Sequence, residues 1–584
     1  MNAPATVHKV NKVDRTDKAD VDPVTVEVLR HRLYAITEQI EANIIRTAYS
    51  PLIYAYKDFA VGMVDAKGQL ICMARGGIPL FCSTVMSIAV QDGLELYGPD
   101  GIEEGDAIIC NYSGIMGQHL NNVAMYTPIF DKAAEGGESG KRTPCAFMVV
   151  LVHWMDVGGR DVGSAATNTT ENIFQEGIQF RTVKLWSRGK PVADMYRMIE
   201  YNTRFPEMVL GDIGSQLAGC KLGAELFGQM LDRYGLPVVT AAIERILDDS
   251  ERIAREVIRE MPDGEYIAET WLDDDGVDLG KPIRVKARVV VKDDNIEVDL
   301  SECSPVVRGA INSGLHGGGV SSASIAMAFI VGGEDAPNAG TFRPLTVTLP
   351  QGTFLSAPAT APMSRYSSPM ATVVDVVLRA VGQALPRRRV GGHHGTFGIH
   401  VFHGYDERGA LFRITDTSQG GYGASAEADG PGPFKTLVHG DSCNVPVELQ
   451  EALYPYRFEG VALRNDSAGA GRFRGGLGVV KDYLVTGPCI FNSAFDRVLC
   501  PPWGVAGGGD GVPGTVTIRR ADGSTETLLK GDAAMQPGDR VRVETAGGGG
   551  YGDPRERPRE QVRHDLKRGY ISAEAAWRLY HLEE

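Results

Sequence analysis

Two histidines and an aspartate have the chemistry of a metal centre. His119 lies in the segment 117–122 (GQHLNN), and His153 ends an apolar run just before Trp154. Asp58 precedes another apolar run. Two imidazoles and one carboxylate, with a position left for water, are a common ligand set of catalytic Zn²⁺ or Mn²⁺. An ion held in this way activates water and polarises a carbonyl or phosphoryl oxygen.

The spacing of these residues is permissive, and the alternative is that each histidine is a hydrogen-bonded structural residue. Other catalytic motifs are absent from the sequence. A phosphate-binding loop needs Gly-x4-Gly-Lys-Ser/Thr, but Lys141 is followed by Arg142, and Glu135 stands where the first glycine is required. There is no His-Glu-x-x-His and no Gly-x-Ser-x-Gly sequence. If the protein uses ATP, we expect the nucleotide to bind to another chain.

A second concentration of histidines lies in the glycine-rich segment 391–404. Strand side chains alternate between two faces, so residues 394, 400 and 403 cannot all share one face. We therefore expect at most one or two of them to join a site. The loops at 416–423 and 429–432 could line a substrate pocket. For these loops and for the histidine segment, the alternative is that they are turns serving the fold. The four histidines are His393, His394, His400 and His403.

The candidate residues stand close to the ends of predicted strands. Short apolar runs predict strands over 59–64, 70–73, 106–110 and 147–152. Asp58 precedes the first of these strands, and His153 follows the last. Polar residues at strand ends are well placed, because a rigid sheet can direct them to one point.

The rest of the chain alternates between helical and strand patterns. Helices are predicted from Pro23, over much of 190–262, over 372–384 and near the C-terminus, and a hairpin is predicted over 283–300. Beyond residue 391 strands and turns dominate. The pattern predicts an α+β, multi-domain, intimately packed protein with a β-rich C-terminal part. The expected divisions are a flexible arm (1–22), an α+β region with the metal site (23–190), a helical and hairpin region (191–390) and a glycine-rich β region with C-terminal helices (391–584).

Composition excludes several classes of protein. The chain is 43% apolar and 23% charged, which is typical of a globular protein that buries a core. Its formal net charge of −15 disfavours binding to nucleic acid or to an anionic membrane. No apolar run is long enough to span a bilayer, and residues 1–22 lack the apolar core of a signal peptide. Nine scattered cysteines without a Cys-x-x-Cys pair favour a reduced, cytoplasmic protein.

The chain resembles the hydantoinase B/oxoprolinase family, which includes metal-bearing subunits of acetone and acetophenone carboxylases and of caprolactamase. The resemblance runs from about Asp22 to the C-terminus, and the order of its motifs makes chance similarity implausible. The motifs are Asp22–Val28, Arg46–Pro51, Asp58-Phe59, His153-x-x-Asp156-Val157-Gly158-Gly159, Ile173–Gly177, Asn338-x-Gly340, Leu463–Gly476 and Gly547–Pro554.

The resemblance implies a metal site at Asp58, His119, position 122 and His153. The family has aspartate at position 122, where this chain has Asn122. An amide oxygen can bind Zn²⁺ or Mn²⁺ but adds no negative charge, so it is the weaker ligand. Either Asn122 is such a ligand, or Asp156 compensates from nearby, or the metal has been lost. Asp156 is also a candidate to hold His153 in the ligating tautomer, and these two residues are the expected catalytic pair.

The resemblance also implies a reaction in two parts. A partner subunit similar to hydantoinase A would use ATP to phosphorylate a carbonyl-type oxygen. At the metal of this chain, activated water would then open the ring of a cyclic amide. The first alternative is an ATP-dependent ketone carboxylase, and the second is a scaffold subunit without catalysis. A hetero-oligomer in the cytoplasm is expected in each of these cases.

Overall fold

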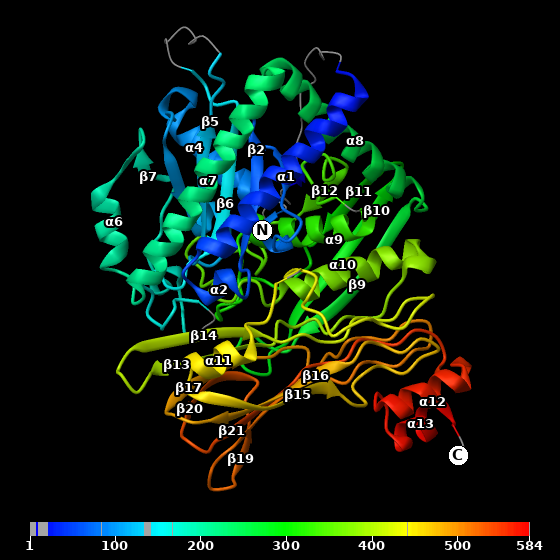
Figure 1. The fold of residues 1–584 in the computed structure, drawn as a ribbon. Helices are drawn as coiled ribbons and strands as arrows, with labels where there is room; N and C mark the ends of the chain where they lie inside the picture. The colour runs from blue at the N-terminus through cyan, green and yellow to red at the C-terminus, as the bar shows by residue number, and fades with distance from the viewer. Residues whose placement is uncertain are drawn as a thin grey trace.

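The computed structural model describes residues 7–9, 21–82, 84–133, 142–165, 168–333, 335–440 and 442–582. Four β-sheets and the helices packed on them make up this part of the chain, so the predicted α+β class is confirmed (Figure 1). None of the described helices is long and apolar enough to cross a bilayer.

The N-terminal region contains a seven-stranded sheet with the order β3-β2-β6-β5-β4-β7-β8. Its two central strands, β5 and β6, are buried at every residue, as expected for a sheet covered on both faces. The strands are β2 (Phe59–Asp65), β3 (Leu70–Met73), β4 (Ala107–Cys110), β5 (Asn122–Ile129), β6 (Ala146–His153), β7 (Val183–Ser187) and β8 (Lys190–Pro191). Packed on them are α1 (Pro23–Thr47), α4 (Val85–Tyr97) and α7 (Pro206–Tyr234).

The local sequence explains where α1 begins. The Asp22 side chain caps the helix by accepting from the backbone N–H of Thr25 at 3.0 Å, and Pro23 occupies the first turn. Upstream, Val7–Lys9 form β1, which pairs with β12 (Leu345–Thr348). The prediction of a flexible arm over 1–22 is therefore wrong for these three residues, because a free sheet edge offers them hydrogen bonds. Residues 1–6 and 10–20 lie outside the described part.

A second sheet occupies the middle of the chain, with the order β1-β12-β11-β10-β9. The predicted hairpin is confirmed, since β10 and β11 pair in antiparallel register. The predicted helix over 372–384 is also confirmed, as α10 (Met370–Ala384), and it packs on β9 and β10. The remaining elements are α6 (Ala193–Glu200), α8 (Leu236–Arg259), β9 (Gly264–Leu272), β10 (Ile283–Lys292), β11 (Asn295–Asp299) and α9 (Ser321–Val331).

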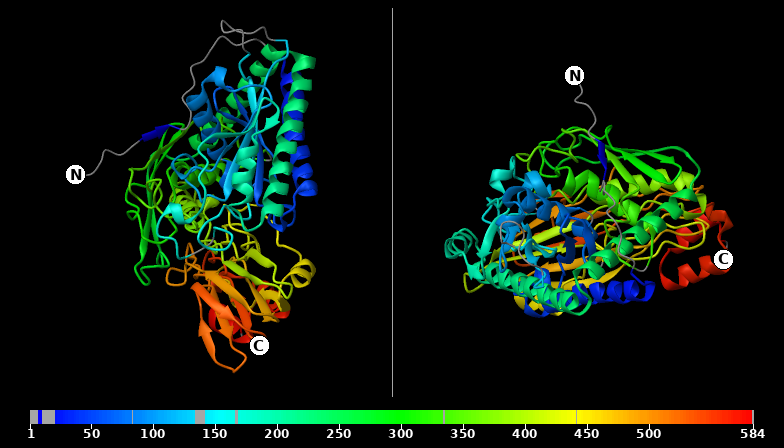
Figure 2. Two further views of the ribbon diagram at one scale, coloured as in Figure 1. Left: turned by 90° about the vertical axis from the view of Figure 1, so that its left-hand side faces the viewer. Right: turned by 90° about the horizontal axis from the view of Figure 1, so that it is seen from above.

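Two antiparallel sheets lie below these layers in the C-terminal region (Figures 1 and 2). The first has the order β14-β13-β17-β20 and the second β15-β16-β21-β18-β19. Their strands are β13 (Ile399–Tyr405), β14 (Leu411–Thr417), β15 (Tyr456–Arg464), β16 (Gly478–Val485), β17 (Cys489–Ala494), β18 (Thr515–Arg519), β19 (Thr525–Thr527), β20 (Lys530–Met535) and β21 (Arg540–Glu544). The helices of this region are α11 (Val447–Leu453), α12 (Arg559–Arg568) and α13 (Ala573–Tyr580).

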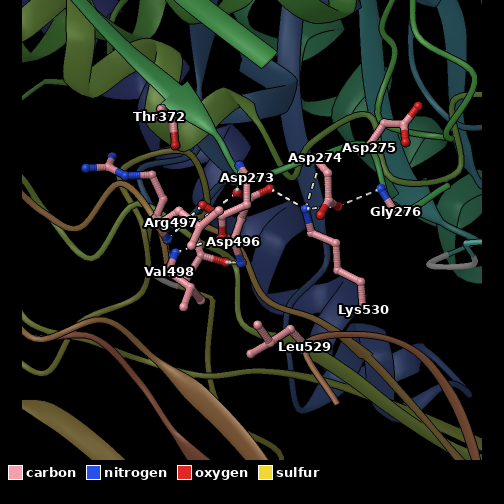
Figure 3. A network of polar contacts seen from close by, with 12 residues as sticks. Asp273, Asp274, Asp275, Gly276, Thr372, Asp496, Arg497, Val498, Leu529 and Lys530 are labelled. Carbon is pink, nitrogen blue, oxygen red and sulfur yellow. Dashed lines mark hydrogen bonds and ion pairs between the residues drawn. The ribbon is translucent and has the colours of Figure 1, made fainter. Parts of the chain in front are cut away.

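A polar network fastens the C-terminal sheets to the central sheet (Figure 3). Asp273, directly after β9, accepts from the backbone N–H groups of Val498 and Leu499 at 2.8 and 2.9 Å. The Lys530 ammonium donates to Asp274 Oδ1 at 3.0 Å and to Asp496 Oδ2 at 2.9 Å. Because Asp496 follows β17 and Lys530 begins β20, these bonds fix the position of the four-stranded sheet.

Candidate functional site

Three neighbouring strands place Asp58, His153 and Asn122 in one row. Asn122, which begins β5, pairs directly with His153, which ends β6. The backbone N–H of His153 donates to the carbonyl of Asp58 at 3.1 Å, so these two residues are also directly opposed. Opposed residues point to the same face of a sheet, with Cβ atoms about 4.5–5.5 Å apart. The row lies at one end of the seven-stranded sheet.

A tight turn adds His119 to this row. Gly117 has φ +68°, and a Cβ there would lie 2.7 Å from the backbone nitrogen of Gly317, so only glycine fits. The turn brings His119 Nε2 to 3.0 Å from Asn122 Oδ1. The His119 and His153 rings lie 4.8 Å apart between centroids, at 82°. The two histidines named from the sequence therefore meet in space.

The hydrogen bonds around His119 suit a metal-binding imidazole. Its Nδ1 lies 3.3 Å from the carbonyl oxygen of Ser364. A proton on Nδ1, donated to that carbonyl, leaves a lone pair on Nε2 for an ion. The Asn122 amide donates to Gln118 Oε1 at 2.9 Å and to the Tyr366 hydroxyl at 2.8 Å, which holds its oxygen toward His119.

The other candidate ligands are grouped less closely. His153 Nδ1 is buried and has no hydrogen-bond partner in the described chain. Within that same part, no three His, Cys, Asp or Glu side chains are grouped closely enough to hold a metal. A metal here would therefore need the amide oxygen of Asn122 beside the two imidazoles, because the Asp58 carboxylate does not complete a three-residue group with them. A neutral amide is a weaker ligand than a carboxylate.

Burial sets the charges at this site. Desolvation lowers the pKa of His119 to about 4 and that of His153 well below its ordinary value, so both rings are neutral near pH 7. Neutral imidazole is the form that binds a metal. Burial also raises the pKa of Asp58 to about 7. A cation in the row would favour the ionised form of that carboxyl group.

Glu176 fixes the loop that carries Ser364 and Tyr366. Its Oε1 accepts from the backbone N–H groups of Met363 at 2.7 Å and of Ser364 at 2.9 Å. The Tyr366 ring in turn lies 4.9 Å from the His119 ring. Sequence reasoning included Glu176 only in a family motif and missed its role. The single local signal was an acidic residue within an otherwise uncharged segment.

The structure gives Asp156 a different task from the one expected. Its carboxylate is fully buried and accepts from Ser164 Oγ at 2.7 Å and from the Arg204 guanidinium and backbone N–H at 2.9 and 2.7 Å. No hydrogen bond joins Asp156 to the His153 ring in the described chain. The expectation that Asp156 orients His153 is therefore wrong, because the loop after β6 turns this side chain toward Arg204.

Comparison with known proteins identifies the family of the chain. The family model described as hydantoinase B/oxoprolinase matches residues 22–554. The chain belongs to the hydantoinase B/oxoprolinase family. It is 29% identical to the B-type subunit of a putative D-/L-hydantoinase of Pseudomonas sp. (strain NS671), over 96% of this chain and 95% of that protein. It is 30% identical to the beta chain of the caprolactamase of Pseudomonas jessenii, over 95% of each protein.

Solved structures support the family membership. The ATP-dependent caprolactamase from Pseudomonas jessenii superposes with a TM-score of 0.87 at 28% identity and covers 96% of both chains. A nucleotide-free acetone carboxylase structure superposes with a TM-score of 0.85, covering 96% of this chain and 79% of that one. The two sequences are 16% identical, so this superposition shows that the fold is shared and nothing more.

The second histidine group divides between the two faces of its sheet in this hydantoinase B/oxoprolinase chain. His400 contacts the neighbouring sheet, where its Nε2 lies 2.9 Å from the Tyr483 hydroxyl. His403 lies on the opposite face and pairs with Arg413. His393 and His394 precede the strand, with rings 4.3 and 6.4 Å from that of Tyr422. The prediction that the strand histidines cannot share one face is confirmed.

The four-stranded sheet contacts the segment that carries Asp58. The Thr417 and Tyr56 side-chain oxygens lie 2.5 Å apart, and Tyr56 is two residues before Asp58. At the other end of β14, Arg413 donates to the carbonyl of Ala165 at 3.0 Å. Sequence reasoning missed Tyr366 and Arg413, because only long-range packing brings them to the row. It also missed Tyr56, whose contact with Thr417 is long-range although Tyr56 is close to Asp58 in sequence.

Glu176 leads to a pH-dependent prediction. Burial raises the pKa of Glu176 to about 8, from an ordinary value near 4.5. Its contribution to folding stability is thus fully present below about pH 4.5 and is lost as the pH rises through about 8. A shift of this size corresponds to up to about 5 kcal/mol. Glu176→Gln keeps the acceptor oxygen and does not titrate. We therefore expect its free energy of unfolding in urea, relative to that of the wild type, to increase from pH 5 to pH 8.5.

The matched control for this measurement is Glu171→Gln, because Glu171 is exposed in the same segment. Its unfolding free energy should follow that of the wild type at every pH. Parallel curves for Glu176→Gln and the wild type would show that the Glu176 carboxyl group does not titrate abnormally.

Proposed function

We propose that this chain is the hydrolytic subunit of an ATP-dependent enzyme that opens cyclic amides of the hydantoin, oxoproline or lactam type. The observation that carries the proposal is the row of Asp58, His153 and Asn122 on adjacent strands, with His119 added by the Gly117 turn. Such a row can hold one divalent ion, Zn²⁺ or Mn²⁺, at the covered end of a rigid sheet.

Each residue of the row has a separate task. His119 and His153 are neutral and would bind the ion; in the bound state the His119 proton would lie on Nδ1, which is 3.3 Å from the Ser364 carbonyl oxygen. Asn122 would supply an amide oxygen. Asp58 would supply negative charge on the same face of the sheet. The ion, when bound, supplies Lewis-acid activation of water and of the substrate oxygen. The four-stranded sheet limits the access of bulk water, which strengthens these electrostatic interactions.

ATP would be used by a separate, hydantoinase A-like subunit. Two relatives are named as the B-type part of a hydantoinase and the beta part of a caprolactamase, which are names of components of larger enzymes. The sequence also lacks a Gly-x4-Gly-Lys-Ser/Thr loop. In the proposed sequence of events the partner phosphorylates the amide oxygen, and this chain receives the activated amide. Water then adds to the activated carbon, the C–N bond of the ring breaks, and the nitrogen takes up a proton. Hydrolysis of the resulting acyl phosphate would release the carboxylate and inorganic phosphate.

The test is reconstitution of this chain with its ATP-binding partner. We expect ATP-dependent ring opening of 5-oxoproline, a hydantoin or a lactam, with one of these preferred and with stoichiometric divalent metal in the complex. Consumption of bicarbonate with a carboxylated product from a ketone would instead establish a carboxylase. A complex that holds no metal and turns over none of these substrates would establish a scaffold subunit.

A further inference from the structure

A buried arginine near the row lacks an ion-pair partner among the described residues. Arg413, on β14, is 4% exposed. One terminal nitrogen donates to the Ala165 carbonyl, while Nε is buried without a hydrogen-bond partner in the described chain. The charge of Asp156 acts favourably on Arg413, but that carboxylate is already bonded to Arg204. Burying an uncompensated cation is costly, so this guanidinium calls for an anion from outside the chain.

The register of the four-stranded sheet directs Arg413 toward the row. On β13, His403 opposes Arg413, and Val401 opposes both Thr415 and Asn492. Arg413, Thr415 and Asn492 therefore share the face that also carries Thr417, the contact of Tyr56. On this face the Thr415 hydroxyl oxygen is buried and, within the described residues, has no hydrogen-bond partner.

Arg413 packs against the loop that contacts the start of β5. A Cβ at Gly163 would lie 2.2 Å from Arg413 Nε, and the Gly163 carbonyl accepts from the side chain of Asn121, the residue before Asn122.

A second buried guanidinium, that of Arg365, lies next to Ser364 in sequence and donates to Asn492 Oδ1 at 2.6 Å. Burial lowers the pKa of Arg365 to about 9; the charge of Asp532 opposes this decrease, and that of Arg413 adds to it. Asp532 on β20 pairs with Asn492, so one carboxylate accompanies the two guanidinium groups on this face.

We propose that Arg413, assisted by the Thr415 hydroxyl, binds an oxyanion group of the substrate beside the row. The inference rests on the proposed function, in which the substrate arrives bearing a phosphoryl group. A guanidinium matches the oxygens of phosphate or carboxylate with parallel N–H donors, and the Nε of Arg413 has no hydrogen-bond partner among the described residues. An anion held there would orient the activated carbon toward the imidazoles. The same chemistry fits a carboxylate of the substrate, so the test separates the two sources.

The test is isothermal titration of the purified full chain with inorganic phosphate and, separately, with acetate, both in the presence of a chelator to remove metal-dependent binding. We expect phosphate to bind the wild type and to bind Arg413→Gln at least about tenfold more weakly. Arg413→Lys should be intermediate, because it keeps the charge but loses the paired donors. The matched control is Arg408→Gln, which removes an exposed arginine from the turn of the same hairpin and should bind like the wild type.

A preference for acetate over phosphate would assign the site to a substrate carboxylate. Equal phosphate affinity in the wild type and Arg413→Gln, or no binding of either anion by the wild type, would overturn the proposal. Thermal unfolding guards against a misfolded variant, because phosphate should raise the melting temperature of the wild type and of Arg408→Gln but not of folded Arg413→Gln. Anion binding without ring opening in the reconstituted enzyme would refute the proposed function alone.

Discussion

Replacing His153 by alanine should abolish turnover by the reconstituted enzyme while leaving the complex assembled. His153 opposes both Asp58 and Asn122, and its ring lies 4.8 Å from that of His119, so it is central to the row. Its buried Nδ1 has no hydrogen-bond partner in the described chain, so truncation removes a ligand and breaks no hydrogen bond to that atom. We expect a loss in kcat of about 10³-fold or more, because an ion that stabilises oxyanion charge is a large catalytic factor.

Three measurements check this expectation: turnover, metal content and assembly with the partner by gel filtration. His564→Ala is the matched control, because this histidine is exposed on α12, and it should leave all three unchanged. Turnover by His153→Ala near the wild-type rate would refute the metal site. Loss of assembly would instead assign His153 a structural role.

Replacing Asp156 by alanine should lower the free energy of unfolding by about 3 kcal/mol, through the loss of a buried charge partner and of several hydrogen bonds. The variant removes the acceptor of Arg204 Nη1, of the Arg204 backbone N–H and of the Ser164 hydroxyl, while Arg204 Nη2 still donates to the Gly159 carbonyl. Arg204 is 32% exposed at its side chain, which lets water compensate part of the loss. Asp156→Asn keeps one acceptor oxygen and should cost about half as much.

Urea unfolding of the full chain measures this effect, and kcat of the reconstituted enzyme separates a structural role from a catalytic one. Folded Asp156→Asn should retain most of the wild-type kcat. Asp194→Ala is the control, because its ion pair with Arg197 is exposed and should contribute less than about 1 kcal/mol. A large loss of kcat in Asp156→Asn at unchanged stability would restore the catalytic assignment.

The sequence by itself determined the elements whose patterns are local. The apolar spacing and the Asp22-Pro23 start predicted α1, and strict alternation predicted the hairpin of β10 and β11. The class and the family followed from such patterns and from motifs spread along the chain. His119 and His153 were selected because they stand next to strands, and the structure brings them together. These features are encoded within short stretches, where side-chain spacing and capping leave few alternatives.

Only the tertiary structure decided which distant residues complete the row. Asp58 opposes His153 because β2 lies next to β6, and no local pattern encodes that strand order. The same motif that supplied His153 suggested a partner role for Asp156, but the chain path after β6 directs that carboxylate to Arg204. Glu176 holds a loop nearly 190 residues later in the chain, and Arg413 belongs to a sheet that is distant in sequence from the row. Contacts of this kind depend on strand register and on the packing of layers, which are set by the whole chain.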